Sequence, residues 1–237
     1  MDTLYIVIPA YNEEKNIEKV INDWYPIVEK YNAGGDSRLV IINDGSKDNT
    51  YEIVMNCAKD KPLLVPITKQ NSGHGGTVLF GYQYASKHGA DYIFQTDSDG
   101  QTLPEEFAPF WEERDQYDMV IGLRNHRQDG FSRIVVTKVL KYVIKLCFGV
   151  TVADANTPYR LMKAGALEKA IDNIPDGFNL SNVLVTVYFE KKGMKIHYIP
   201  ITFRPRQGGK NSINIKNIIK IGYKALGDFV HLNKQIR

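Results

Sequence analysis

The sequence predicts an α/β fold in which a mostly parallel central sheet carries helices on both faces. Two features indicate this class: short apolar runs alternate with helix-like segments along the first half of the chain, and polar loops follow the ends of the apolar runs. Strands that alternate with helices form right-handed crossovers and lie parallel in one sheet. With 237 residues, 43% hydrophobic and 24% charged, the chain is large enough for one globular domain with a substantial core.

The strands and helices of the first half follow one another in regular alternation. Residues 4–9 form an apolar run, and Asn12, Glu13 and Glu14 then supply a cap and first-turn acids for a helix that reaches about residue 29. The next elements are expected, in chain order, as a strand over 39–42, a helix from 46–48 towards 59, a strand over 63–68, a helix over 75–87, and strands over 92–96 and 119–121.

The second half is less regular and contains two helical stretches with unusual faces. Helices are expected over 132–148, near 180–192 and over 214–233, and a strand near 195–203, with a Pro-Tyr-Arg segment at 158–160 between them. Lysines recur on one face of the first and last stretches: Lys138, Lys141 and Lys145, then Lys216, Lys220 and Lys224. Broad apolar faces accompany both rows and include Ile144 in the first stretch and Phe229 in the last. Such amphipathic helices fit contact with a membrane surface, and packing of the apolar faces on the sheet is the alternative.

Two aspartates follow the strand expected over 92–96. Asp97 and Asp99 stand two residues apart, so in an extended turn both carboxylates face the same side. Oxygen ligands suit Mg²⁺ or Mn²⁺, and such an ion also binds a diphosphate. The pair therefore predicts a divalent metal site, with a solvated Asp-Gly turn as the alternative because Gly100 follows.

Polar loops also follow the first two strands. Tyr11 could stack on a nucleotide base, and Asp44 could accept hydrogen bonds from a base edge or a ribose hydroxyl. Helix capping is the alternative for these loops, because Asn12 and Ser46 each precede an expected helix. The segment Gly73-His74-Gly75-Gly76 resembles a phosphate cradle but lacks the lysine and hydroxyl of a P-loop.

Six segments in register resemble the family 2 glycosyltransferases of the GT-A fold, in the dolichol-phosphate mannose synthase branch. They span nearly the whole chain: IPAYNEE at 8–14, NDGSKDNT at 43–50, QTDSDGQ at 95–101, IGLR at 121–124, DANTPYR at 154–160 and FRPRQGGKNS at 203–212. The family usually has two aspartates where this chain has Asn43-Asp44, which weakens the inference about base recognition. The resemblance implies one GT-A domain over 1–237, with a nucleotide-sugar-binding half at 1–123 and an acceptor-binding half at 124–237 that carries the amphipathic helices.

The resemblance also implies roles for single residues. The nucleotide-sugar would be bound by Pro9, Tyr11, Glu13, Asp44, Asp97, Arg204 and Lys210. Mg²⁺ or Mn²⁺ would be held by Asp97, Asp99 and Gln101. Arg204 and Lys210 flank Gly208 and Gly209, an arrangement that suits a lid over the donor phosphates, with a solvated basic loop as the alternative. The acceptor phosphate would be bound by Arg124, Arg133 and Thr137.

The expected reaction is transfer of a hexose, with inversion, from a GDP- or UDP-sugar to a polyprenyl phosphate such as dolichyl or undecaprenyl phosphate. An ionised phosphate attacks without a general base, so Asp154 would orient the acceptor or Arg160. The alternative enzyme transfers to a saccharide or protein hydroxyl with Asp154 as the base. A non-catalytic nucleotide-sugar-binding protein is the alternative from another class.

Composition indicates where the protein works. Two cysteines form no disulfide framework, and we expect neither a signal peptide nor a membrane span, so a cytoplasmic protein, peripheral on the cytosolic face of a membrane, is expected. The net charge of +3 is too small to indicate nucleic acid as a partner. A membrane-protein partner or a homo-oligomer is compatible with this interpretation.

Overall fold

The computed structural model describes residues 2–125, 131–175, 177–206, 229, 232 and 233; the side chains of residues 125 and 131–138 are outside this description. A seven-stranded sheet forms its centre, in the order β3-β2-β1-β4-β6-β5-β7. The strands are β1 (Leu4–Ala10), β2 (Arg38–Asn43), β3 (Leu64–Thr68), β4 (Tyr92–Thr96), β5 (Met119–Asn125), β6 (Tyr159–Lys163) and β7 (Ile196–Thr202). The pairs β1–β2, β1–β4, β2–β3 and β5–β7 are parallel, whereas β6 runs antiparallel to β4 and β5. The predicted mostly parallel sheet is confirmed.

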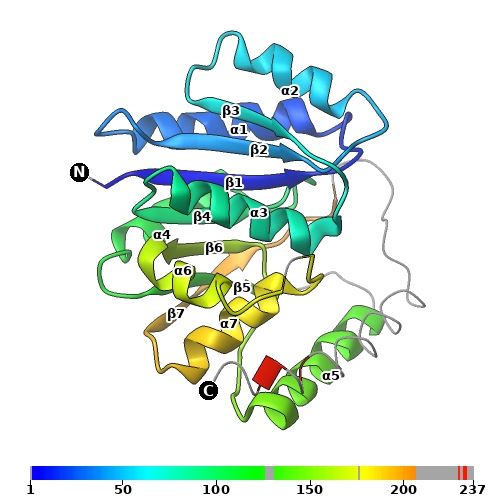
Figure 1. Ribbon diagram of the computed structural model, residues 1–237, viewed down its shortest axis with the longest axis vertical. Coiled ribbons are helices and arrows are strands. Elements are labelled where there is room, and N and C mark those ends of the chain that lie inside the picture. Colours follow the sequence, from blue (N-terminus) through cyan, green and yellow to red (C-terminus); the bar gives the residue numbers. More distant parts are fainter. Residues whose placement is uncertain (1, 126–130, 176, 207–228, 230–231, 234–237) are drawn as a thin grey trace.

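Helices cover both faces of the sheet (Figure 1). They are α1 (Ile17–Lys30), α2 (Thr50–Ala58), α3 (Gly73–Lys87), α4 (Phe107–Glu112) after the short 3₁₀ turn η1 (Pro104–Glu106), α5 (Phe131–Phe148), α6 (Ala164–Ile171) and α7 (Ser181–Lys191). Side chains of α3, α5, α6 and α7 contribute to one apolar cluster, and those of α1, α2 and α4 to the other. The sheet therefore lies between two layers of helices, as predicted.

The central strand β1 shows why this sequence forms the middle of the sheet. All seven of its residues are buried. Successive side chains point to opposite faces, so Tyr5 and Val7 join one apolar cluster and Leu4, Ile6 and Ile8 join the other. A strand covered on both faces is apolar at every position, which is the pattern of the run over 4–9.

Three elements are absent from the sequence-based prediction. Strand β6 lies in the segment around 158–160, and the helices α4 and α6 were not expected. The β6 sequence, YRLMK, contains two basic residues and has no strand periodicity that distinguishes it from a loop. Its pairing with β4 and β5 is a long-range interaction that local sequence does not encode.

Part of the last expected helix is described. The stretch 214–233 lies outside the described residues except for Phe229, Leu232 and Asn233. Phe229 and Leu232 are buried, and the Phe229 ring centroid lies 5.2 Å from that of Phe148 and 6.1 Å from that of Phe178. At these two positions the apolar residues pack against the body of the protein.

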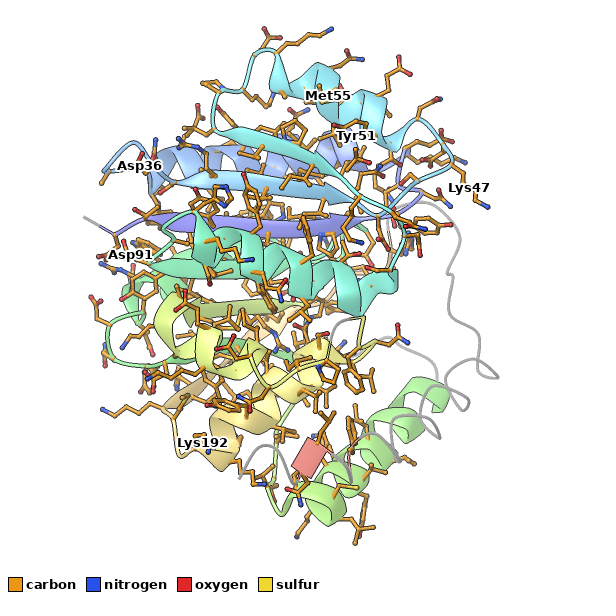
Figure 2. All side chains as sticks on the ribbon, viewed as in Figure 1. Asp36, Lys47, Tyr51, Met55, Asp91 and Lys192 are labelled. Atoms are coloured by element: carbon orange, nitrogen blue, oxygen red, sulfur yellow. The ribbon has the colours of Figure 1, made fainter. Side chains whose placement is uncertain are left out.

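The two ends of the sheet differ in what their loops contain. Because β2, β1 and β4 are adjacent and parallel, the loops that follow them meet at one edge. Figure 2 shows Lys47 at this end, and Asp36 and Asp91 at the opposite end. Glycines with positive φ form turns here, at Gly45 (66°) and Gly100 (71°), a conformation that other residues adopt only at a cost.

Candidate active site

The loops after β1 and β2 are joined by hydrogen bonds. The hydroxyl oxygen of Ser46 accepts a bond from the Asn12 main-chain N–H at 2.9 Å, and the Asn12 side-chain oxygen accepts one from the Lys47 N–H at 2.8 Å. The helices instead begin after Asn16 and Asn49, neither of which makes a side-chain capping bond. Helix capping by Asn12 and Ser46 is therefore wrong, since both residues connect the two loops.

The aspartate pair lies directly beyond β4. One oxygen of each carboxylate is bound by the protein: Asp97 Oδ1 accepts from Gln95 Nε2 at 3.0 Å, and Asp99 Oδ1 accepts from the Gln101 main-chain N–H at 3.1 Å. His74 Nε2 also lies 3.7 Å from Asp97 Oδ1. Asp97 Oδ2 has no hydrogen-bond partner among the described residues.

The acidic residues perturb one another. Burial and the charge of Asp97 raise the pKa of Asp99 to about 6, although the hydrogen bond from the Gln101 N–H and the charge of Arg206 lower it. Burial also raises the pKa of Glu13, opposed by Asn16 and Arg206. A partly buried cluster of carboxylates is destabilised by its own charge, so it favours the binding of a cation.

A basic segment after β7 supplies a cation to this cluster. Arg206 forms an ion pair with Glu13 and places Nη1 3.9 Å from Asp99 Oδ2. The segment is held by Gln101, whose main-chain oxygen accepts from the Arg204 N–H at 2.9 Å and whose Nε2 donates to the Arg204 oxygen at 2.8 Å. Arg206 was not among the predicted site residues, although the Arg-Pro-Arg sequence contained the signal.

The predicted lid residues are only partly described. Arg204 Nη2 lies 3.4 Å from the Gly100 oxygen, and its Nε is buried without a partner among the described residues. Lys210 lies outside the described residues. Within the described part of the chain, Arg206 and not Arg204 contacts the acidic cluster.

Asp44 has a structural role at this edge. The residue is 3% exposed, and its carboxylate accepts bonds from Lys69 Nζ at 2.6 Å, from the Ser72 N–H at 2.9 Å and from the Gly73 N–H at 3.0 Å. The N-terminus of α3 thus already holds a carboxylate. Recognition of a base by Asp44 remains a prediction.

The glycines that begin α3 allow close packing. A Cβ atom at Gly75 would lie 2.3 Å from the main-chain oxygen of Phe178 and 2.4 Å from that of Asn179. Only glycine fits such an approach, so this position brings α3 against the segment before α7. The resemblance of this segment to a phosphate cradle thus has a packing explanation.

A second charged pair lies beyond β5. Arg124 binds Asp154 with two parallel bonds, Nε to Oδ2 at 2.8 Å and Nη2 to Oδ1 at 2.9 Å. Both side chains are largely buried, and the Arg124 guanidinium lies 5.2 Å from the centroid of the Phe203 ring. This geometry orients Arg124 firmly.

Arg160 is a structural residue. It is fully buried, and its guanidinium donates to the main-chain oxygens of Ala155, Thr157 and Asn182 and to the Thr186 hydroxyl. Burial lowers the pKa of Arg160, and the negative charge of Asp154 opposes this effect. Asp154 therefore influences Arg160 through charge, while its hydrogen bonds orient Arg124.

The outer surface of α5 combines apolar and basic side chains. Three large apolar residues are exposed: Val139 by 55%, Tyr142 by 80% and Leu146 by 85%. Lys141 and Lys145 are exposed beside them, whereas Ile144 is fully buried against the body. The side chains of Arg133, Thr137 and Lys138 lie outside the description. Among the described helices, none is long and apolar enough to cross a membrane.

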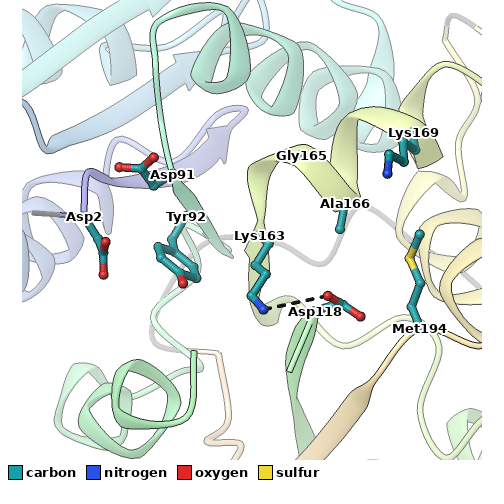
Figure 3. Close-up of a pocket in the computed structure, with 9 residues that line it drawn as sticks. All are labelled: Asp2, Asp91, Tyr92, Asp118, Lys163, Gly165, Ala166, Lys169 and Met194. Carbon is teal, nitrogen blue, oxygen red and sulfur yellow. Dashed lines mark ion pairs between the residues drawn. The ribbon is translucent and has the colours of Figure 1, made fainter. Parts of the chain in front are cut away.

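A hollow of about 580 Å³ lies at the opposite end of the sheet. Figure 3 shows Lys163 directed towards Asp118, 3.9 Å away, with Asp2, Asp91 and Lys169 around them. Main-chain groups bind two of these acids as well: the Thr3 N–H donates to Asp91 and the Lys195 N–H to Asp118. Because the acids and Lys163 have partners, the hollow gives no indication of chemistry.

The chain is similar to proteins of a known family. The family model "Glycosyl transferase family 2" matches residues 5–171. A UDP-N-acetylglucosamine–dolichyl-phosphate N-acetylglucosaminyltransferase of Methanococcus voltae is 30% identical, over 94% of each chain. The chain belongs to glycosyl transferase family 2.

Two further proteins are similar to the chain. The polyprenol monophosphomannose synthase of Mycolicibacterium smegmatis is 25% identical over 93% of this chain and 84% of its own. The glucosyl-3-phosphoglycerate synthase of Mycobacterium tuberculosis, solved with Mn²⁺, UDP and its product, superposes with a TM-score of 0.70 at 18% identity, covering 98% of this chain and 80% of its own. The similarity to the solved structure confirms the expected GT-A-like fold. The relatives from Methanococcus voltae and Mycolicibacterium smegmatis belong to the polyprenyl-phosphate sugar transferase branch.

The residues of this family 2 protein fit a hard divalent cation at the aspartate pair. Asp97 Oδ2 and the Gln101 side-chain oxygen make no hydrogen bond in the described part of the chain. Carboxylate and amide oxygens are ligands that Mg²⁺ and Mn²⁺ accept. No group of three or more His, Cys, Asp and Glu residues gathers for a metal among the described residues.

Proposed function

We propose that the protein transfers a hexose, with inversion, from a GDP- or UDP-sugar to a polyprenyl phosphate. The observation that carries this proposal is that the loops after β1, β2 and β4 meet at one edge of the sheet, where Arg206 contacts Glu13 and Asp99. Acidic and basic groups then face one place at the ligand-binding edge of a parallel sheet. The two relatives named for sugar transfer to a lipid phosphate support this choice of acceptor.

The donor would bind with its diphosphate at the aspartate pair. Asp97, Asp99 and Gln101 would hold Mg²⁺ or Mn²⁺, which neutralises charge on the leaving nucleoside diphosphate. Pro9 and Tyr11 lie at the end of β1, where the 40%-exposed Tyr11 ring is accessible for stacking on the base. Arg206, Arg204 and Lys210 would bind the phosphates from the other side, because guanidinium and ammonium groups match phosphate oxygens.

The acceptor would approach from the side of Arg124. A phosphate monoester is ionised at neutral pH and needs no base, whereas a sugar hydroxyl does. Asp154 accepts two parallel bonds from Arg124, so its carboxylate is already the partner of a cation. This pair therefore supports an orienting role for Asp154, with Arg133 and Thr137 as further phosphate ligands.

A lipid acceptor requires contact with a membrane surface. The exposed apolar residues of α5 and its neighbouring lysines suit peripheral contact with an anionic leaflet. We propose that this contact is on the cytosolic face. A separate membrane protein or a second copy of the chain would strengthen it.

The test is a transfer assay with labelled donors and a panel of acceptors. Purified protein with Mn²⁺ is given GDP-mannose, UDP-glucose or UDP-N-acetylglucosamine, and undecaprenyl or dolichyl phosphate in detergent. Label in the lipid fraction with one donor supports the proposal. Label on a saccharide or peptide, with a loss of about 10²–10⁴-fold in Asp154→Asn, indicates a hydroxyl acceptor instead. Donor binding without transfer to any acceptor indicates a nucleotide-sugar-binding protein.

A further inference from the structure

A chain of hydrogen bonds leads from the protein core to Asp97. The Tyr82 hydroxyl donates to Asn182 Oδ1 at 2.7 Å, and Asn182 Nδ2 donates to Gln95 Oε1 at 2.9 Å. Gln95 Nε2 then donates to Asp97 Oδ1 at 3.0 Å. The three residues come from α3, α7 and β4, so the chain connects distant parts of the sequence at one carboxylate.

These groups are buried, which makes their partners important. Tyr82 and Gln95 are fully buried and Asn182 is 4% exposed. An unpaired polar group in such surroundings is costly, so each link depends on the next. Burial also raises the pKa of Tyr82, which keeps its hydroxyl protonated and able to donate.

The direction of the chain follows from its last member, the Asp97 carboxylate, which only accepts hydrogen bonds. The Tyr82 hydroxyl donates to the Asn182 oxygen, and the Asn182 NH₂ group donates to the Gln95 oxygen. Because the Gln95 oxygen accepts this bond, the NH₂ group of Gln95 faces Asp97 and donates to it. Reversal of both amides would place the Gln95 oxygen against the Asp97 carboxylate, which is repulsive.

Asn182 is itself fixed in place. Its main-chain oxygen accepts from Arg160 Nη1 at 3.0 Å, and the neighbouring Ser181 hydroxyl donates to the Gly75 oxygen at 3.0 Å. The first turn of α7 is therefore joined to β6 and α3. A fixed Asn182 transmits its orientation to Gln95.

We propose that Tyr82, Asn182 and Gln95 are positioning residues that hold Asp97 Oδ1 and so aim Oδ2 at the metal. This inference rests on the proposed metal-binding role of Asp97. Groups that hydrogen-bond to a metal ligand orient it, and their removal costs about 10–100-fold in metal affinity. None of the three is among the residues proposed to hold the donor or the metal.

The experiment measures Mn²⁺ affinity of the purified protein by calorimetry, with GDP or UDP present. Gln95→Met keeps the volume but removes the donor, and we expect binding about tenfold weaker. Tyr82→Phe, which removes one hydroxyl, should weaken binding by less. Tyr5→Phe is the matched control, because its hydroxyl donates to the His88 oxygen at 3.2 Å, at the other end of the sheet. Thermal unfolding shows that each variant is folded.

A double variant separates positioning from general packing. If the residues act through one chain, Tyr82→Phe has no further effect on Mn²⁺ affinity once Gln95→Met is present. The inference is overturned if the variants bind Mn²⁺ as tightly as the wild type, or if the losses of affinity in the two single variants add in the double variant. If the inference fails but the wild-type protein transfers sugar, the proposed function stands. If the wild-type protein neither binds Mn²⁺ nor transfers sugar, both the inference and the proposed function fail.

Discussion

At the scale of single residues, the proposed sugar transfer depends most on the aspartate pair. We expect Asp97→Asn and Asp99→Asn each to lower the transfer rate by more than about 100-fold, since a metal contributes several kcal/mol to transition-state stabilisation. Removing a carboxylate from an already crowded acidic cluster should not lower the melting temperature. Steady-state transfer assays and thermal unfolding measure the two effects. Near-normal transfer by Asp97→Asn in buffer with a chelator would eliminate the metal role.

Arg206 gives a second prediction at this scale. Because it contacts Glu13 and Asp99, Arg206→Ala should lower kcat/KM for the donor by about 100-fold, the usual cost of losing one group that stabilises developing negative charge. The control is Arg114→Ala, whose side chain pairs with Asp2 at the opposite end of the sheet. Equal kinetics in the two variants would contradict a role for Arg206 at the diphosphate.

Single-residue roles could be predicted where spacing alone carries them. The two-residue spacing of Asp97 and Asp99 placed both at the site, because it depends only on an extended turn. The contact of Arg206 with Glu13 and Asp99 depends on how the segment after β7 folds, so no spacing indicated it. The roles of Arg204 and Lys210 over the donor phosphates stay predictions. Asn12 and Ser46 have capping chemistry, yet they bind each other's loops, a contact that arises only after β1 and β2 pair.

At the scale of elements, an aromatic cluster stabilises the sheet beneath the aspartate pair. Phe94 of β4 contacts the rings of Trp24, Phe107 and Tyr159 at centroid distances of 5.2, 4.9 and 4.7 Å. Phe94→Ala should lower the free energy of unfolding by about 3–5 kcal/mol, because it leaves a cavity among buried rings.

Chemical denaturation measures this loss. Met55→Ala is the control, since Met55 is 43% exposed on α2 and its truncation should change stability by less than about 0.5 kcal/mol. A loss at Phe94 no greater than that at Met55 would contradict the packing described for β4.

Elements could be predicted from the sequence where their pattern is local. Strands such as β1 are apolar at every position because both faces are covered, and α1 begins after a run of polar residues. Strand β6 could not be recognised, since its identity comes from pairing with β4 and β5 and from burial of Arg160 against α7. The same long-range contacts give Asn182 its place beside Gln95, which no spacing in the sequence indicates.

At the scale of the whole molecule, α5 is the described surface that suits a membrane. We expect the protein to bind anionic liposomes at low salt and to bind less as salt rises, because charge attraction is screened over about 8 Å at physiological ionic strength. The triple variant Val139→Ser, Tyr142→Ser, Leu146→Ser should lose the binding that remains at high salt. Co-sedimentation measures both parts.

The control for that experiment is Met55→Ser, which removes an exposed apolar residue from α2, far from α5 in Figure 2. No binding to anionic or neutral liposomes at any salt concentration would contradict membrane contact. The Phe229 ring packs against Phe148 inside the protein. Among the described helices, we therefore expect α5 to make the membrane contact.

The central claim is that a sugar moves from a nucleotide to a lipid phosphate at the aspartate pair. The most direct measurement is mass spectrometry of the lipid product together with the nucleoside diphosphate released in the same reaction. We predict one glycosyl phosphoryl-polyprenol for each nucleoside diphosphate, and neither product after addition of EDTA or in Asp97→Asn. Release of nucleoside diphosphate with free sugar, or with a glycosylated hydroxyl compound in place of the lipid, would contradict the account.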